Sequence, residues 1–333
     1  MTINEKELYK KLVKLMNTEP EFVKKYTKNH IKENYNNEEY WEYLFKTASF
    51  DNEFIKECYE EINYNYLFLY QVLDEDILLW LDTRINLFDY IQVLLENQSL
   101  PNKLLYKYLN TVGNPDFYTL ALNQDLPEDI IEKYLDKWDW DILSQEQCLK
   151  LRFIIKHHDK INWKVLPLNL KTQYLFNDGF VKLFEDKPFW DNIGWMDKVS
   201  IDFIYRYEKN MTINGWLSLL EHKNLDTSDI IKILEHIPTN ETDKLNQAWE
   251  FISNSQTLDN DFIDKYHEKL NWKDICLFYP LDWETIQKYS TYIQLRYLSN
   301  NDCMTNELAN KIKNSNLFTE KLDDKDYDKI DKD

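Results

Sequence analysis

The sequence predicts an all-α protein, an α-solenoid of about twelve short two-helix repeats with a period of 23–27 residues. Three stretches share one pattern, in which a capping residue precedes a Phe-Ile-like pair and an aromatic pair follows. They are Leu-Asp-Asn-Asp-Phe-Ile-Asp-Lys-Tyr at 258–266 before Asn271-Trp272, Leu-Pro-Glu-Asp-Ile-Ile-Glu-Lys-Tyr at 126–134 before Asp139-Trp140, and Phe-Asp-Asn-Glu-Phe-Ile-Lys-Glu-Cys at 50–58 before Asn63-Tyr64.

The first residue of the Phe-Ile pair serves as an anchor that recurs along the chain. Most anchors are 23–27 residues apart, and two intervals are 32 residues. The anchors are Phe22, Phe54, Ile77, Leu104, Ile130, Phe153, Phe180, Phe203, Ile230, Phe262, Thr285 and Leu308.

The first helix of each repeat is predicted from residues around the anchor. Three residues before it stand N-cap residues such as Asp51, Asp74, Thr227 and Asp259, with Pro101 and Pro127 as variants. Apolar residues occupy the positions just before the cap and just after the anchor, as in a hydrophobic staple. An aromatic residue commonly follows four residues after the anchor, so we expect a first helix of about nine or ten residues.

A second helix is predicted in each repeat from a second cap nine residues after the anchor. These caps are Asn63, Asn86, Asp139, Asn162 and Asn271. A large residue follows each, often Trp, and most of the 11 Trp are therefore expected in the core. Trp80, Trp138 and Trp283 fall outside this position and are expected to be more exposed. Helices this short need neighbours that bury their apolar faces.

The repeats predict a single domain over residues 1–318, although 333 residues alone would suggest two. Residues 319–333 leave the pattern, carry many charges and are expected to form a disordered tail.

The net charge of −19 is unevenly distributed. Residues 1–35 carry about +3, residues 36–150 carry −15 and the remainder carries −7. Such an acidic chain disfavours general nucleic-acid binding and favours a basic protein partner, with solubility as the alternative explanation. The residues predicted to bind that partner lie early in second helices, on the inner surface of the solenoid: Asp89, Asp116, Asp141 and Asp191. Acids of first helices are expected to face away from the core, namely Glu57, Glu60, Glu61, Glu128, Asp129 and Glu132.

No motif for catalysis, a cofactor, a small-molecule substrate or a metal is predicted. Four Gly are too few for a phosphate-binding loop. His157 and His158 form the one His pair of the chain. His157 occupies the Tyr position of its repeat, which predicts a packing role for it rather than metal binding. The carboxylate pairs Asp139/Asp141 and Asp259/Asp261 stand at helix starts, where acids complement the helix dipole, so this reading is preferred over a cation site.

The expected location is the cytoplasm. Four widely separated Cys fit a reducing compartment, and neither an apolar signal core nor an apolar run of 18 residues occurs.

The Leu-x-x-x-Phe-Ile-x-x-Tyr core with its trailing Asn-Trp resembles degenerate helical repeats in proteins of giant DNA viruses and large phages. The resemblance covers about residues 15–318, and the Lys-, Asn- and Ile-rich composition is similar too. It implies a viral protein that acts in the host cell cytoplasm through protein contacts, and no functional residue carries over. The expected function is an interaction scaffold or adaptor, with a basic host factor as one candidate partner. A structural component of a virion or large viral assembly, or an enzyme with an unrecognised site, are the alternatives.

Overall fold

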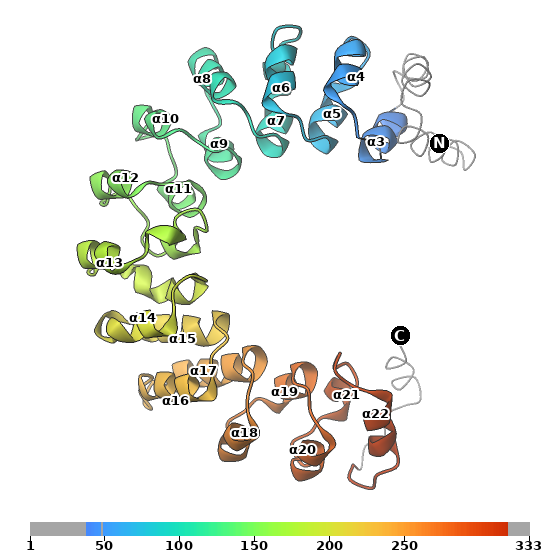
Figure 1. Ribbon diagram of the computed structural model, residues 1–333, viewed down its shortest axis with the longest axis vertical. Helices are drawn as coiled ribbons and strands as arrows, with labels where there is room; N and C mark the ends of the chain where they lie inside the picture. Colours follow the sequence, from blue (N-terminus) through green and yellow to red (C-terminus); the bar gives the residue numbers. More distant parts are fainter. Residues whose placement is uncertain (1–37, 48, 319–333) are drawn as a thin grey trace. The chain divides into compact units, whose positions relative to one another are not determined.

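The computed structural model describes residues 38–47 and 49–318, and these ranges are all-helical without any strand (Figure 1). The all-α prediction is therefore confirmed. The first anchor, Phe22, and the predicted tail at 319–333 lie outside the described residues. None of the helices within the described ranges has the length and apolar character needed to cross a bilayer.

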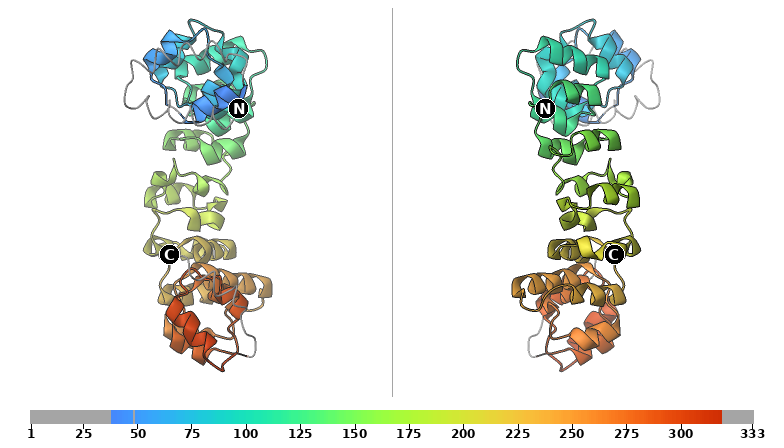
Figure 2. Two further views of the ribbon diagram at one scale, coloured as in Figure 1. Left: turned by 90° about the vertical axis from the view of Figure 1, so that its right-hand side faces the viewer. Right: turned by 90° about the vertical axis from the view of Figure 1, so that its left-hand side faces the viewer.

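The chain divides by contact density into two compact units, 1–161 and 162–333. This division by contacts does not show whether the two units fold separately, so the single domain over 1–318 stays a prediction. Short helices follow one another through each unit in both views of Figure 2.

In the first unit the helices form two rows, which alternate along the chain (Figure 1). The first row consists of α4 (Asn52–Glu57), α6 (Glu75–Leu81), α8 (Asn102–Thr111), α10 (Glu128–Lys133) and α12 (Leu151–Lys156). The second row consists of α3 (Glu38–Thr47), α5 (Tyr64–Tyr70), η1 (Leu87–Tyr90) with α7 (Ile91–Asn97), α9 (Phe117–Asn123) and α11 (Trp140–Glu146). Each second-row α-helix packs against the next one in the row.

The second unit repeats this alternation with more 3-10 helix. Helices that start at an anchor cap are α13 (Asp178–Phe184), α14 (Ile201–Arg206), α16 (Thr227–Glu235), α18 (Asn260–Tyr266), α20 (Trp283–Lys288) and α22 (Asn306–Lys313). Before α13 come η2 (Leu166–Leu168) and η3 (Gln173–Leu175). The remaining elements lie between the anchor helices: η4 (Pro188–Trp195), η5 (Glu208–Asn210), α15 (Ile213–His222), α17 (Thr242–Ser255), α19 (Trp272–Phe278) and α21 (Leu295–Leu298).

The predicted caps of the first helices are largely confirmed. The Asp51, Asp74 and Asp259 carboxylates each accept the backbone N–H three residues later. In α16 the cap is Asp226 instead of Thr227, which is the first helical residue. Pro101 and Pro127 stand at the cap position and give no side-chain hydrogen bond.

The prediction of nine or ten residues for first helices is wrong for most of them. Helices α4, α10, α12, α14 and α20 have six residues each. The residue in the Tyr position is itself the C-cap, as Tyr134, His157 and Tyr289 show with φ near −125°, −116° and −107°. The chain leaves the helix at this residue and turns toward the second helix.

The anchors form the core, because every described anchor except Leu308 is buried. Trp163, Trp190 and Trp272 are buried as predicted. The expectation of exposure for Trp138 is wrong: its ring is buried and its indole N–H donates to the Ile131 carbonyl at 3.0 Å, beneath the end of α10.

Where α-helices are expected after Trp163 and Trp190, the second unit has the 3-10 helices η2, η3 and η4. Pro167 lies in η2 and Pro188 begins η4, and proline lacks the N–H that an α-helix interior requires. Helix η4 approaches α15 closely at Gly194: a Cβ at this residue would lie 2.0 Å from the Ser218 carbonyl oxygen. Only glycine allows this approach.

A ladder of glutamines, which we had not predicted, links the second-row helices of the first unit. Gln71, Gln98, Gln124 and Gln147 are the C-caps of α5, α7, α9 and α11. The Gln124 amide donates to the carbonyls of Leu95 and Gln98 at 2.8 and 2.7 Å, and its Oε1 accepts the Leu100 N–H at 2.8 Å. The side chains of Gln98 and Gln147 repeat this pattern one helix earlier and one helix later. The ladder therefore sets a common register for the row.

Candidate protein-docking surface

Four helices of equal length present the same positions to solvent in the first unit. Helices α5, α7, α9 and α11 have seven residues each and end at a ladder glutamine. The fourth residue of each is buried, and so is the fifth. Two positions are exposed in all four helices: the second, with Asn65, Gln92, Tyr118 and Asp141, and the sixth, with Leu69, Glu96, Leu122 and Gln145. We call these eight side chains the second-row face.

The chemistry of this face alternates from helix to helix. Leu69 of α5 and Leu122 of α9 are 42% and 40% exposed, and Tyr118 of α9 is 56% exposed. Helix α7 between them presents Gln92 and Glu96, whose side chains hydrogen-bond at 2.5 Å. Leu69 and Leu122 leave part of their apolar side chains in water at equivalent positions, and a docked partner would bury that surface.

Three of the four acids predicted to bind a partner lie near the starts of second-row elements in the first unit. Asp116 is the N-cap of α9 and accepts the Thr119 N–H at 3.0 Å and the Thr119 hydroxyl at 2.8 Å. Asp89 in η1 accepts the Asn86 amide at 2.7 Å. Asp141 is the second residue of α11 and belongs to the second-row face.

Asp191 lies in the second unit, within η4, so the structure does not place it on the second-row face. Its carboxylate accepts the Thr212 hydroxyl at 2.6 Å and lies 3.6 Å from the Lys164 ammonium. That these four acids bind a partner stays a prediction.

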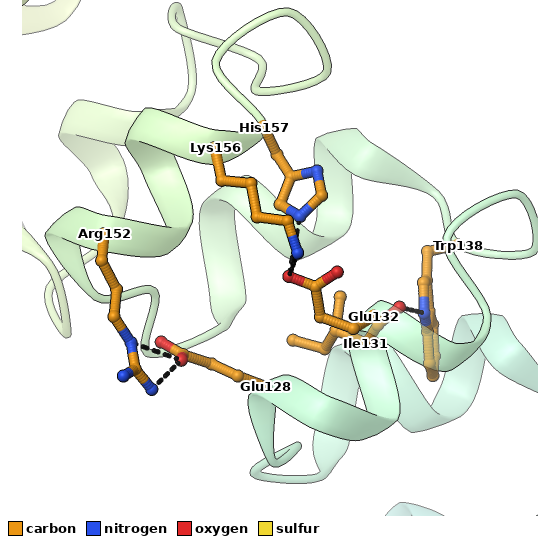
Figure 3. A network of polar contacts seen from close by, with 7 residues as sticks. All are labelled: Glu128, Ile131, Glu132, Trp138, Arg152, Lys156 and His157. Atoms are coloured by element: carbon orange, nitrogen blue, oxygen red, sulfur yellow. Dashed lines mark hydrogen bonds and ion pairs between the residues drawn. The ribbon is translucent and has the colours of Figure 1, made fainter.

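The first row carries a groove of about 710 Å³ between α10 and α12, and Figure 3 shows the polar contacts that connect the two helices there. Glu128 Oε2 accepts from Arg152 at 2.9 Å, while Glu132 Oε1 accepts from Lys156 at 2.6 Å and lies 3.0 Å from His157 Nε2. Glu128 and Glu132, which are predicted to face away from the core, are half-buried and turned toward α12, the next helix of the first row. The hydrogen bond from Lys156, followed by that from His157, lowers the pKa of the Glu132 carboxyl.

This groove neutralises its own charges. Three acidic side chains line it, and so do three basic ones: Glu128, Asp129, Glu132, Lys133, Arg152 and Lys156. Asp129 accepts the Tyr106 hydroxyl of α8, and Lys133 donates to Asn110 at 2.9 Å. Glu128 Oε1 is buried without a hydrogen-bond partner among the described atoms. The groove is therefore a contact between neighbouring repeats, a joint in which the charged side chains pair with residues of the adjacent helices.

The residues weighed for metal binding have structural roles. Asp139 and Asp259 are N-caps, in agreement with the helix-start interpretation. His157 is buried against Phe153, with ring centroids 4.6 Å apart. Across the described ranges, no three His, Cys, Asp or Glu side chains form a group suited to a metal ion.

The residues that sequence reasoning missed are the exposed leucines and the ladder glutamines. A signal for the glutamines exists, because each stands six residues before the next anchor, at 77, 104, 130 and 153. The glutamine also locates the exposed sixth position of each second helix, which lies two residues before it. Comparison of the chain with protein-family models, with curated proteins and with solved structures finds no match.

Proposed function

We propose that this chain is an interaction scaffold or adaptor, an α-solenoid of about twelve two-helix repeats that binds a protein partner. Repeating units that contact their sequence neighbours present extended surfaces, and such surfaces commonly bind proteins. The alternation of two rows and the glutamine ladder support this architecture within the first unit.

The observation that carries the proposal is the pair of exposed leucines, Leu69 and Leu122, at equivalent positions of an ordered helix row. The segment that contains this row carries −15 over residues 36–150. A basic partner gains attraction from this field and buries the leucines on docking. We propose binding rather than catalysis, and a viral origin would make the partner a host protein of the cytoplasm.

Selection from a library of random 12-residue peptides tests the proposal with the full chain as bait. We expect recovered peptides to carry net positive charge and apolar residues, and their affinity to fall between about 50 and 300 mM salt. The control bait is the Leu69→Ser/Leu122→Ser variant, which should lose these peptides. Recovery of neutral or acidic peptides, or of none above the control, would contradict the proposal.

A further inference from the structure

Resting on the proposed function, we infer that the second-row face takes a basic segment in polyproline II conformation, with apolar side chains at positions i and i+6 and Lys or Arg at i+3. The inference follows from the spacing and chemistry of the sixth positions in α5, α7 and α9.

The sixth positions stand in line across the row because the ladder repeats the same contact from helix to helix. Gln98 caps α7 and donates to the carbonyls of Phe68 and Gln71 at the end of α5, at 2.7 and 2.6 Å. Gln124 does the same from α9 to the end of α7. Leu69, Glu96 and Leu122 therefore occupy successive steps of one line, in the order apolar, acidic, apolar.

The step between neighbouring packed helices is about 8–10 Å. A polyproline II chain has three residues per turn and a rise of about 3.1 Å, so its side chains return to the same side about every 9.3 Å. A β-strand returns every two residues, about 6.6–6.8 Å, and its third residue points to the opposite side. Only the first geometry places residues i, i+3 and i+6 over three successive helices.

The chemistry of the occupant follows from the three steps. Leu69 and Leu122 favour apolar side chains at i and i+6, and Tyr118 adds an exposed ring beside Leu122 on α9. Glu96 is exposed and favours a cation at i+3. The surrounding charge favours further basic residues in the flanks of the segment.

The test measures fluorescence anisotropy of labelled peptides with the full chain. The probe contains Leu-Pro-Pro-Lys-Pro-Pro-Leu with Gly-Ser flanks, and its controls are a scrambled peptide of the same composition and a Leu-Pro-Lys-Pro-Leu peptide with shortened spacing. We expect the probe to bind at least about tenfold more tightly than either control, since each control buries at most one leucine in register.

Variants assign the binding to the face. Leu69→Ser/Leu122→Ser should weaken the probe about tenfold or more, and Glu96→Gln should abolish the preference for Lys over norleucine at the central position. Ile155→Ser is the matched control, because Ile155 is 47% exposed but belongs to first-row α12. It should leave affinity unchanged.

The outcomes separate this inference from the proposed function. Equal affinity for the probe and the shortened peptide, both lost in Leu69→Ser/Leu122→Ser, would overturn the spacing and leave the proposed function standing. Basic peptides that all fail to bind would overturn both. A dimer in sedimentation that becomes monomeric in Leu69→Ser/Leu122→Ser would assign the face to a second copy and overturn the inference.

Discussion

Single residues at the anchors determine how much each repeat contributes to stability. Phe262 is 3% exposed and contacts Tyr266 with ring centroids 4.6 Å apart, so Phe262→Ala leaves a cavity in the core. We expect a loss of about 3–5 kcal/mol in the free energy of unfolding, measured by urea denaturation. Phe278→Ala is the matched control: Phe278 is 62% exposed, and its loss should cost under about 1 kcal/mol. Equal costs would contradict a core role for the anchor.

Glu132 couples the joint between α10 and α12 to pH. Its pKa is lowered below the ordinary 4.5, first by the hydrogen bond from Lys156, so the folded state binds this proton less tightly than the unfolded state. The stabilisation is therefore complete above pH 4.5 and disappears as the pH falls through the lowered pKa. We expect Glu132→Gln to be less stable than the natural chain at pH 7.

The difference in stability between this variant and the natural chain should narrow as the pH falls from 7 to 3, because a protonated Glu resembles Gln in shape and charge. Urea denaturation of both proteins at the two pH values measures the difference. A gap in unfolding free energy that is the same at pH 7 and pH 3 would show that the charge of Glu132 does not stabilise the joint.

At the scale of elements, the ladder joins helices that are too short to persist alone. Gln124 hydrogen-bonds two carbonyls and one N–H at the connection between α7 and α9. Gln124→Met keeps the volume and removes these bonds, so we expect a loss of roughly 2–4 kcal/mol. Hydrogen exchange should also accelerate at the Leu100 amide.

The matched control is Gln92→Met on the exposed side of α7, which should change stability by less than about 0.5 kcal/mol. An unchanged exchange rate at Leu100 in Gln124→Met would mean that the ladder does not hold the α7–α9 connection.

At the scale of the whole molecule, the location of charge matters more than its sum. Asp89→Asn/Asp116→Asn/Asp141→Asn removes three charges from the first unit and leaves an amide that can still cap α9. Asp261→Asn/Glu268→Gln/Glu284→Gln removes three exposed charges from the second unit. Both variants carry −16 if the natural chain carries −19.

For a basic peptide recovered by the selection, we expect the first variant to slow association several-fold at about 50 mM salt and the second to have a smaller effect. Stopped-flow fluorescence measures the association rate constant, and the difference should narrow at about 300 mM salt. Equal effects from the two variants would count against the acidic segment as the docking region.

Local signals in the sequence were enough to predict the helical class, the anchors and most caps. Each of these depends on residues within about four positions, as when Asp51 accepts the Phe54 N–H. The length of the first helices was predicted poorly, because the point at which the chain leaves the helix depends on how the following helix packs. Of the second-row face, only Asp141 was among the predicted residues. Asp89 and Asp116 lie near the starts of second-row elements but outside that face, and Asp191 lies in the other unit.

Tertiary structure decided the features that join one repeat to the next. Gln124 reaches carbonyls 26 and 29 residues away, and Glu128 meets Arg152 24 residues away. Whether a leucine such as Leu69 is buried or exposed depends on the helices beside it. The sequence of one helix does not show which of its apolar residues a neighbouring helix covers. The sequence by itself determined where helices start, through local hydrogen bonds. The packing of neighbouring repeats determined which side chains they share and which remain available to a partner.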